Sequence, residues 1–382
     1  MMLPLGVEVA LVLASVAVLL YQGFALLLAR EMPRLDPAPL GETPAPELPR
    51  VSVVVAARDE ELDLPATLDD LLAQDYPNLE ILVVEDHSVD RTGSVIDARA
   101  PRVRRVNPPP LPDGWVGKSW ACWNGAAAAT GTWILFLDAD VRTHPSAVRT
   151  MVEWALREHA DLATIAPRVE MGSFWERVVL PFYMQVVVTY FRAPHVNRAG
   201  SRAAMANGQF WLTPRATYLA LGGHEAVRSI VLEDIAIARR YRAAAKTLRL
   251  AWAPEIARTR MYRDRAELFE GLLKNVHGTR FSAIRLVGSI VGLVGLYLLP
   301  LGLLPLGLAT GDPVLSALGG FLVFALFGKH VVFAHAVGAP PAYGLLYPLA
   351  VAYYVALLGT SLGRGLRHKP VAWKGRGYPM GP

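Results

Sequence analysis

The apolar residues of this chain are concentrated at its two ends, and this distribution restricts the possible folds more than any other feature. Hydrophobic residues make up 53% of the 382 residues and charged residues only 19%, whereas an ordinary soluble domain has about 25% charged residues. Leu5 to Ala29 contains one charged side chain, Glu8, and about 20 apolar residues suffice to cross a bilayer. Because no basic segment precedes this stretch and it is long for a cleaved signal peptide, we predict a retained transmembrane anchor at residues 1–30.

The last third of the chain is apolar again. It contains three further candidate spans, at Ile284–Ala309, Val314–Val337 and Tyr343–Leu362. Lys329, His330 and His335 make the middle stretch costly as a lipid-exposed helix, so we expect one of the three to be re-entrant or interfacial, and the sequence does not decide which. We therefore predict two or three membrane segments within residues 284–363 and a basic tail at residues 364–382.

The charged residues beside these stretches predict the orientation. Arg30 and Arg34 directly follow the first apolar stretch, and an excess of Lys and Arg marks the cytoplasmic side of a membrane. We therefore expect a multi-pass protein of the cell (inner) membrane with its middle part in the cytoplasm. Three crossings after that part would place the basic tail outside, which conflicts with the same rule. The Pro-rich residues 31–50 predict a linker after the anchor.

The remaining composition limits the class of protein and its partners. The apolar excess excludes a disordered chain and a coiled coil. The net charge of +5 suits a membrane protein near anionic lipid, or a phosphorylated substrate. No dense basic run occurs, so we expect no nucleic-acid partner. The single cysteine, Cys122, cannot form an intramolecular disulfide.

The middle of the chain alternates β-branched runs with helical patterns. The runs are Val51–Ala56, Leu79–Val84 and Trp133–Leu137. The helical patterns are Asp63–Gln74, Asp90–Arg99 and Lys118–Thr130. Continuous apolar runs are typical of parallel strands that are buried on both faces. We therefore predict an open α/β sheet in a domain at residues 51–283, in which ligands bind beyond the carboxyl ends of the strands.

Acidic residues follow each of these predicted strands. They are Asp59 after the first strand, Glu85 and Asp86 after the second, and Asp138 and Asp140 after the third. Helix capping is the alternative explanation for each cluster taken singly. Together the clusters would meet at one edge of the sheet, where carboxylates repel one another unless a cation compensates them. The Asp138-Ala139-Asp140 pair predicts a Mg²⁺ or Mn²⁺ site, since these hard cations prefer oxygen ligands.

Two further motifs carry candidate chemistry. Lys118 follows Gly114 and Gly117 at a predicted helix start, which suits a phosphate, although a solvated loop lysine is an equal alternative. Glu233 and Asp234 open another predicted helix, either as acids that complement its dipole or as a carboxylate base. His224 alone is interpreted as a loop residue rather than as a ligand.

These motifs occur in an order that is typical of one enzyme family. They are Val53–Glu60, Val84–Asp90, Phe136–Asp140 and Leu232–Asp234. In this order they resemble the family 2 glycosyltransferases, which are inverting enzymes with the Rossmann-like GT-A fold. Gly114–Cys122 and Trp373–Tyr378 narrow the resemblance to the membrane-anchored branch that acts on isoprenoid lipids, including carotenoid and hopanoid-associated glycosyltransferases. The resemblance covers Val51–Lys274 and the membrane ends.

The resemblance implies a role for each matching residue. The donor would be bound by Ala57, Asp59, Glu85, Asp86, Lys118 and Asp138. The metal would be held by Asp138 and Asp140. The sugar and acceptor side would be lined by Asn207, Gly208 and Gln209. The general base would be Asp234, with Glu233 beside it.

The implied reaction is an inverting hexosyl transfer from a nucleotide sugar, with UDP-glucose as the expected donor. The acceptor would be the hydroxyl or carboxyl group of a membrane lipid, such as a carotenoid or related isoprenoid. Many family members have two aspartates where this chain has Glu85-Asp86, and it lacks the Gln-x-x-Arg-Trp motif of processive and ceramide-type members, which favours a single transfer. Two alternatives stay open: a nucleotidyl- or phosphotransferase that uses the same metal site, and a non-catalytic membrane scaffold with a degenerate transferase domain.

Overall fold

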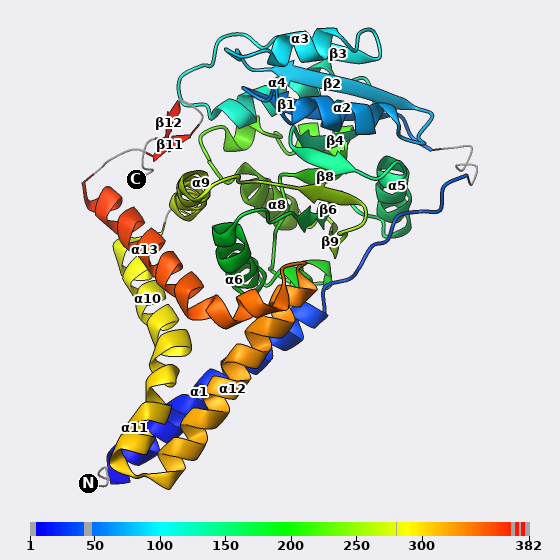
Figure 1. Ribbon diagram of the computed structural model, residues 1–382. Coiled ribbons are helices and arrows are strands. Elements are labelled where there is room, and N and C mark those ends of the chain that lie inside the picture. Colours follow the sequence, from blue (N-terminus) through cyan, green and yellow to red (C-terminus); the bar gives the residue numbers. More distant parts are fainter. Residues whose placement is uncertain (1–4, 42–47, 280, 368–370, 374–375, 379–382) are drawn as a thin grey trace. The chain divides into compact units, whose positions relative to one another are not determined.

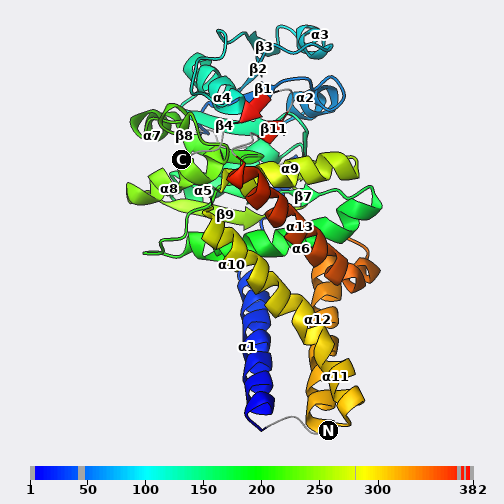
Figure 2. The same ribbon diagram turned by 90° about the vertical axis from the view of Figure 1, so that its left-hand side faces the viewer.

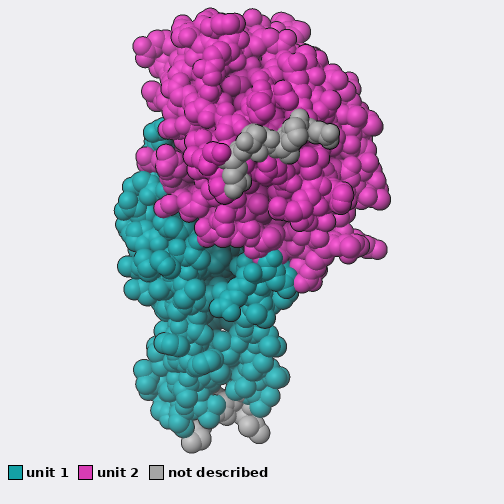
Figure 3. Space-filling model, turned by 90° about the vertical axis from the view of Figure 1, so that its right-hand side faces the viewer, with its two compact units in different colours: residues 1–31, 171–190, 262–382 teal, residues 32–170, 191–261 magenta. Residues whose placement is uncertain are grey.

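The chain divides into two compact units (Figure 3). The computed structural model describes every residue except 1–4, 42–47, 280, 368–370, 374–375 and 379–382. Unit 1 comprises residues 1–31, 171–190 and 262–382, and unit 2 comprises residues 32–170 and 191–261. Each unit is therefore assembled from segments that are distant in the sequence.

The centre of unit 2 is a seven-stranded sheet with the strand order β3-β2-β1-β4-β8-β6-β9 (Figure 1). Its strands are β1 (Val51–Ala57), β2 (Leu79–Glu85), β3 (Val103–Val106), β4 (Trp133–Asp138), β6 (Leu162–Ala166), β8 (Phe210–Pro214) and β9 (Leu248–Trp252). Only β8 runs antiparallel to its neighbours, β4 and β6. A smaller sheet contains β5 (Val141–Thr143), β10 (Ala257–Thr259) and β7 (Arg168–Val169). The predicted α/β class with a mostly parallel sheet is thus confirmed.

Helices cover both faces of the large sheet, because alternate strand residues are apolar on each face. Val53 and Val55 of β1 point into one core and Val54 into the other. The first core also includes residues of α2 (Leu64–Leu72), α3 (Thr92–Asp97) and α5 (Ala147–Arg157). The second includes residues of α4 (Gly117–Ala128), α7 (Arg215–Ala220) and α8 (Glu233–Ala243).

The third helix is shorter than its sequence pattern predicts. A helix was expected over Asp90–Arg99, whereas α3 spans Thr92–Asp97. The carboxylate of Asp90 accepts a hydrogen bond from the Thr92 amide at 2.9 Å, so Asp90 lies before the helix and satisfies one of its first free N–H groups. At its other end the chain approaches Pro101, and the residue before a proline is disfavoured in helical geometry.

The strand order reverses beside β1, which lies between β2 and β4. In the sheet register, Ala57 is opposite Glu85 and Ala56 is opposite Asp138. The carboxyl ends of three strands therefore meet at one edge of the sheet. Ligands of open α/β sheets bind at such a switch point, so the topology locates the candidate site.

Part of the predicted linker is attached to unit 2. Leu35 donates a backbone hydrogen bond to the Trp252 carbonyl at 2.9 Å. The Ala38 amide donates to the Thr150 hydroxyl at 2.9 Å, and the Arg149 guanidinium donates to the Pro39 carbonyl at 2.6 Å. These bonds fix residues 35–39 along the domain, although their Pro-rich sequence indicates a free linker. Residues 42–47 of the same segment lie outside the described residues.

Unit 1 consists mainly of helices. They are α1 (Leu5–Arg30), α6 (Phe174–Phe191), α9 (Arg265–Gly278), α10 (Ala283–Leu293), α11 (Leu303–Thr310), α12 (Pro313–Ala336) and α13 (Tyr347–Leu366). Among the described residues, four helical stretches are long and apolar enough to cross a membrane: Val9–Arg30, Ala283–Thr310, Pro313–Ala336 and Pro341–Leu366. Apolar helices at both ends of the chain were predicted and are present. Figure 2 shows α11 and α12 side by side as a helical hairpin.

The second of these stretches is not a continuous α-helix. Between α10 and α11 lie a π-helical turn, η3 (Val294–Leu298), and a 3₁₀ turn, η4 (Leu299–Gly302). Pro300 has no N–H group for the carbonyl four residues earlier, which belongs to Leu296. The side-chain amide of Gln22 in α1 donates to this carbonyl at 3.3 Å. The break is thus compensated inside unit 1, as a membrane environment requires.

Lys329 and His330 are buried among the helices of unit 1. The ammonium of Lys329 donates to the side-chain oxygen of Gln22 and lies 5.5 Å from the centre of the Tyr297 ring. The His330 ring stacks on Tyr347 with their centres 4.2 Å apart. Polar groups in membrane helices are tolerated when they face the helix bundle. Two of the three residues that weakened Val314–Val337 as a candidate span are therefore compatible with one, and the third, His335, is exposed in the last turn of α12.

The position of α4 depends on a glycine. A Cβ atom on Gly125 would lie 2.3 Å from Cγ1 of Val54, so the helix contacts β1 without an intervening side chain. We predict that Gly125→Ala lowers the free energy of unfolding by about 1–3 kcal/mol, because overpacking forces the backbone to move. Ala127→Ser, on the exposed face of the same helix, is the matched control, with an expected change of at most about 0.5 kcal/mol. Denaturant titration followed by tryptophan fluorescence measures both; equal stabilities would contradict the close packing.

Candidate active site

One ammonium group connects the acidic residues at this edge of the sheet. Nζ of Lys118 lies 2.7 Å from Oδ1 of Asp138 and 3.3 Å from Oε1 of Glu233. Asp138 is the last residue of β4, Lys118 lies in the first turn of α4, and Glu233 is the first residue of α8. The Glu233 side chain is only 8% exposed and that of Lys118 is 35% exposed. Three elements of unit 2 thus bring opposite charges together at a partly open position.

Asp234 lies beside this cluster and is held by backbone amides. Its Oδ2 accepts a hydrogen bond from Gly208 at 2.7 Å, and its Oδ1 accepts one from Ile235 at 2.7 Å. Burial, and next the charge of Glu233, raise the pKa of Asp234 to about 6. A carboxyl group with such a pKa can exchange a proton near neutral pH.

The backbone of Gly208 lies close to both Asp234 and Lys118. A Cβ atom at this position would lie 3.1 Å from Oδ2 of Asp234 and 3.1 Å from Nζ of Lys118. Any larger residue would therefore push against both. The flanking residues form a small network, in which the Asn207 side chain donates to Oε1 of Gln209 at 3.2 Å and accepts from the Gln209 amide at 3.2 Å. The Gln209 carbonyl in turn accepts from the Asp138 amide at 3.1 Å, so this loop is tied directly to the end of β4.

Asp140 completes the aspartate pair. Its Oδ2 accepts a hydrogen bond from the Thr259 hydroxyl at 3.0 Å. Burial, and next the neighbouring charge of Asp138, raise the pKa of Asp140 to about 6. Because the charge of Asp138 contributes to this rise, the two carboxylates repel each other. A divalent cation would relieve that repulsion.

The donor set fits a hard cation. Asp138 and Asp140 supply carboxylate oxygens, which Mg²⁺ and Mn²⁺ prefer. Within the described part of the chain, no group of three or more His, Cys, Asp or Glu residues is placed to hold a metal ion. The protein would therefore supply only part of the coordination, and water and substrate phosphates would supply the rest, as is usual for Mg²⁺.

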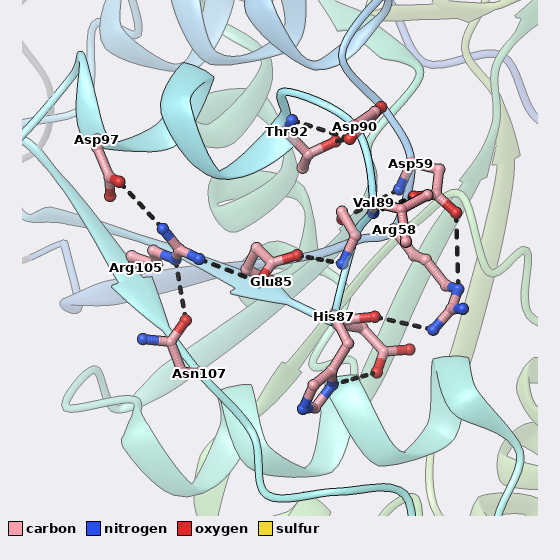
Figure 4. A network of polar contacts seen from close by, with 12 residues as sticks. Arg58, Asp59, Glu85, His87, Val89, Asp90, Thr92, Asp97, Arg105 and Asn107 are labelled. Atoms are coloured by element: carbon pink, nitrogen blue, oxygen red, sulfur yellow. Dashed lines mark hydrogen bonds and ion pairs between the residues drawn. The ribbon is translucent and has the colours of Figure 1, made fainter.

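The loop after β2 is held by a polar network (Figure 4). Oε1 of Glu85 accepts from the Ser88 amide at 2.6 Å, and Oε2 accepts from the Arg105 guanidinium at 3.1 Å. Burial alone would raise the pKa of Glu85, but the hydrogen bonds from Ser88 and Arg105 outweigh it and lower the pKa below its ordinary value. Both oxygens of Glu85 are therefore engaged within the protein. Arg105 also donates to Asp97 at 3.0 Å and to Asn107 at 2.9 Å.

Asp59 follows β1 and Asp86 follows β2, and hydrogen bonds join the two segments. Oδ1 of Asp59 accepts from the Val89 amide at 2.8 Å, and Asp59 itself has a left-handed backbone with φ of 53°. Asp86 is 3% exposed, with Nδ1 of His87 at 3.5 Å. The structure thus places Ala57, Asp59, Glu85 and Asp86 around the ends of β1 and β2. Helix capping, the alternative explanation, applies in this region to Asp90, whose carboxylate bonds the first amide of α3.

Some residues of the site have no signal in the sequence. Arg105 lies on a short strand 20 residues from Glu85, to which it donates a hydrogen bond. Thr259 lies on another short strand, 119 residues from its partner Asp140. His224 lies in a turn, as predicted for a loop residue; it is 1% exposed, and its Nδ1 lies 2.8 Å from the Tyr218 hydroxyl. Burial, and next the charge of Lys118, lower the pKa of His224 to about 3. The histidine is therefore a neutral packing residue behind the site.

Comparison with known proteins shows what this domain is similar to. Residues 52–217 match the family described as glycosyl transferase family 2. In the search of solved structures, the mannosyltransferase PcManGT from Pyrobaculum calidifontis, in complex with GDP-Man and Mn²⁺, aligns with 94% of this chain and 98% of that chain, at 18% identity and a TM-score of 0.52. This likeness concerns the fold. The predicted GT-A architecture is confirmed.

Two curated relatives have the same name. The 4,4'-diaponeurosporenoate glycosyltransferase of Staphylococcus haemolyticus (strain JCSC1435) is 25% identical over 230 residues, which cover 60% of this chain and 60% of the relative. The protein of that name from Staphylococcus aureus (strain USA300) is 28% identical over 263 residues, which cover 65% of this chain and 68% of the relative. The chain therefore matches less than two thirds of the length of the first relative.

The polar network around Glu85 generates a prediction. Arg105→Met removes the partner of one Glu85 oxygen and leaves that oxygen buried, so we expect the free energy of unfolding to fall by about 1–3 kcal/mol. Arg102→Met is the matched control, because the exposed Arg102 of the same segment makes one hydrogen bond to a backbone carbonyl. Chemical denaturation compares the two variants with the parent protein. If Arg105→Met were no less stable than Arg102→Met, the network would not hold this loop.

Proposed function

We propose that this chain transfers a hexose from a nucleotide sugar, with UDP-glucose as the expected donor, to the hydroxyl or carboxyl group of a membrane lipid, with inversion at the sugar carbon. One observation carries the proposal: Lys118 contacts Asp138 and Glu233, while Gly208 bonds Asp234 directly beside it. The residue proposed as base and the residue proposed to hold the metal therefore share one small site. A carotenoid or related isoprenoid is the proposed acceptor, which the names of the two relatives support.

The proposed roles follow from the chemistry of each group. Asp138 and Asp140 would hold Mg²⁺ or Mn²⁺, which would neutralise the diphosphate as it leaves. Ala57, Asp59 and Asp86 would border the nucleoside, and Glu85 would act indirectly by shaping that loop, since both of its oxygens are engaged. Asn207, Gly208 and Gln209 would line the sugar and acceptor side.

Asp234 would take the proton from an attacking hydroxyl group. A single carboxylate base suffices for direct displacement, which converts an α-linked donor into a β-linked product. Glu233 would keep the pKa of Asp234 high through its negative charge. We also propose that the chain lies in the cell (inner) membrane with unit 2 in the cytoplasm, because Arg30 and Arg34 follow the first apolar helix.

The direct experiment incubates the full-length protein in lipid vesicles with a panel of hydroxylated and carboxylated isoprenoids and with nucleotide sugars labelled, in separate reactions, in the sugar or in the phosphates. Sugar label without phosphate label in an extracted lipid supports the proposal. Label from the nucleotide phosphate in the lipid would instead identify a nucleotidyl- or phosphotransferase. Absence of donor binding by calorimetry, together with no transfer, would favour a non-catalytic scaffold.

Asp234→Asn tests the base. With a hydroxyl acceptor we expect kcat to fall by about 100- to 10,000-fold, because the asparagine amide cannot take the proton. With a carboxyl acceptor the loss should be far smaller, since a carboxylate is already ionised at neutral pH. Asp36→Asn, an exposed acid whose side chain pairs with Arg34, is the control and should be fully active. Equal loss with both acceptors would reject Asp234 as the base.

The raised pKa of Asp234 predicts a pH dependence. With a hydroxyl acceptor and saturating Mn²⁺, kcat/KM should fall as the pH drops through about 6, because protonation removes the base. Glu233→Gln removes the like charge that raises this pKa, so the acid limb should move to lower pH. The pH profiles of the parent and the variant, measured side by side, check the sign of the shift; a limb that moves upward would contradict it.

A further inference from the structure

Lys118 occupies one oxygen of the carboxylate that would hold a metal. Its Nζ lies 2.7 Å from Oδ1 of Asp138, and its second partner is Glu233 at 3.3 Å. We infer that Lys118 is an internal counter-ion that competes with a divalent cation for Asp138, so that cation and nucleoside diphosphate bind with stronger positive coupling than they would without it. The inference rests on the proposed function, because it takes Asp138 as a metal ligand.

The backbone fixes where this ammonium can reach. The amide of Val116, the residue before α4, donates to the Arg228 carbonyl at 2.7 Å, and the Trp120 amide donates to the Val116 carbonyl at 2.9 Å. The close contact of Gly125 with Val54 positions the same helix on β1. The stem of Lys118 is therefore anchored, and only its flexible end can move. With 35% of the side chain exposed, that end can leave Asp138 without opening the core.

Repulsion between the Lys118 ammonium and a divalent cation explains the coupling of cation binding to nucleotide binding. A divalent cation on Asp138 would stand next to the Lys118 ammonium, and two positive charges at such a separation repel. The phosphate oxygens of a bound nucleoside diphosphate would offer the ammonium a new charge-assisted partner. The donor would thus free Asp138 for the cation, and by thermodynamic reciprocity the cation would strengthen donor binding by the same factor.

A purely structural role for Lys118 predicts something different. If the ammonium only held the end of β4 to the start of α8, its removal would separate Asp138 from Glu233 and lower stability. Cation affinity would then stay the same or decrease. The two explanations therefore differ in the sign of the change in cation affinity.

The test measures Mn²⁺ binding to the full-length protein in detergent, from the electron paramagnetic resonance signal of free Mn²⁺. Without nucleotide, Lys118→Met should bind Mn²⁺ at least about tenfold more tightly than the parent protein, which is within the usual range of coupling between sites. Lys118→Arg keeps the charge and should bind as weakly as the parent. Asp138→Asn should abolish the tight binding of Lys118→Met in the double variant, and Asp36→Asn should change nothing. Unchanged or weaker binding by Lys118→Met would overturn the inference.

A second measurement compares the coupling in two proteins. In the parent protein UDP should raise the affinity for Mn²⁺, and in Lys118→Met it should raise that affinity by a smaller factor, because UDP draws the ammonium away from Asp138 only in the parent. Equal Mn²⁺ affinity with and without UDP in the parent would overturn the inference even if Lys118→Met failed to fold. Stronger coupling in the parent without any sugar transfer would support the inference and reject the proposed function, whereas transfer with equal coupling in both proteins would do the opposite.

Discussion

The ion pairs of Lys118 are the interaction on which the arrangement of the site depends. Asp138 ends β4, whereas the adjacent Glu233 and Asp234 open α8, which is far from β4 in the sequence. The negative charges of these residues oppose a close approach. One ammonium, 2.7 Å from Asp138 and 3.3 Å from Glu233, offsets part of this repulsion. The balance is incomplete, because the carboxylates of Asp138, Asp140, Glu233 and Asp234 outnumber this one ammonium; burial, and next the neighbouring carboxylates, raise the pKa values of Asp140 and Asp234 to about 6. A site with more acidic than basic side chains is suited to attract a cation.

Much of the fold follows from patterns that are local in the sequence. The continuous β-branched runs identified β1, β2 and β4, and parallel pairing then required their carboxyl ends to meet, as the register of Ala57 with Glu85 shows. The position of Asp138 at a strand end followed in the same way. The pairing of Arg105 with Glu85 was not predictable, because it depends on which strand lies at the edge of the sheet. The short length of α3 was missed because Asp90 bonds the chain two residues onward.

The helical unit shows a related limit of sequence patterns. Composition alone makes Lys329 an obstacle to a membrane helix, and only the tertiary structure supplies its partner, Gln22. The same glutamine also bonds the carbonyl of Leu296 that Pro300 leaves free. One polar side chain of α1 therefore compensates both a buried charge and a broken helix. These two bonds explain why the polar Gln22 is compatible with the otherwise apolar helix α1.

The chemistry of the proposed acceptor determines how much the site would need a base. An alcohol must lose a proton as it attacks, and the partly buried Asp234, held by the amides of Gly208 and Ile235, would be suited to receive it. A carboxylate needs no such help, and its own negative charge would be repelled by Asp234 unless Asp234 were protonated. A pKa raised to about 6 brings the protonated form within reach near neutral pH. Burial of this single residue is therefore compatible with attack by either kind of oxygen nucleophile.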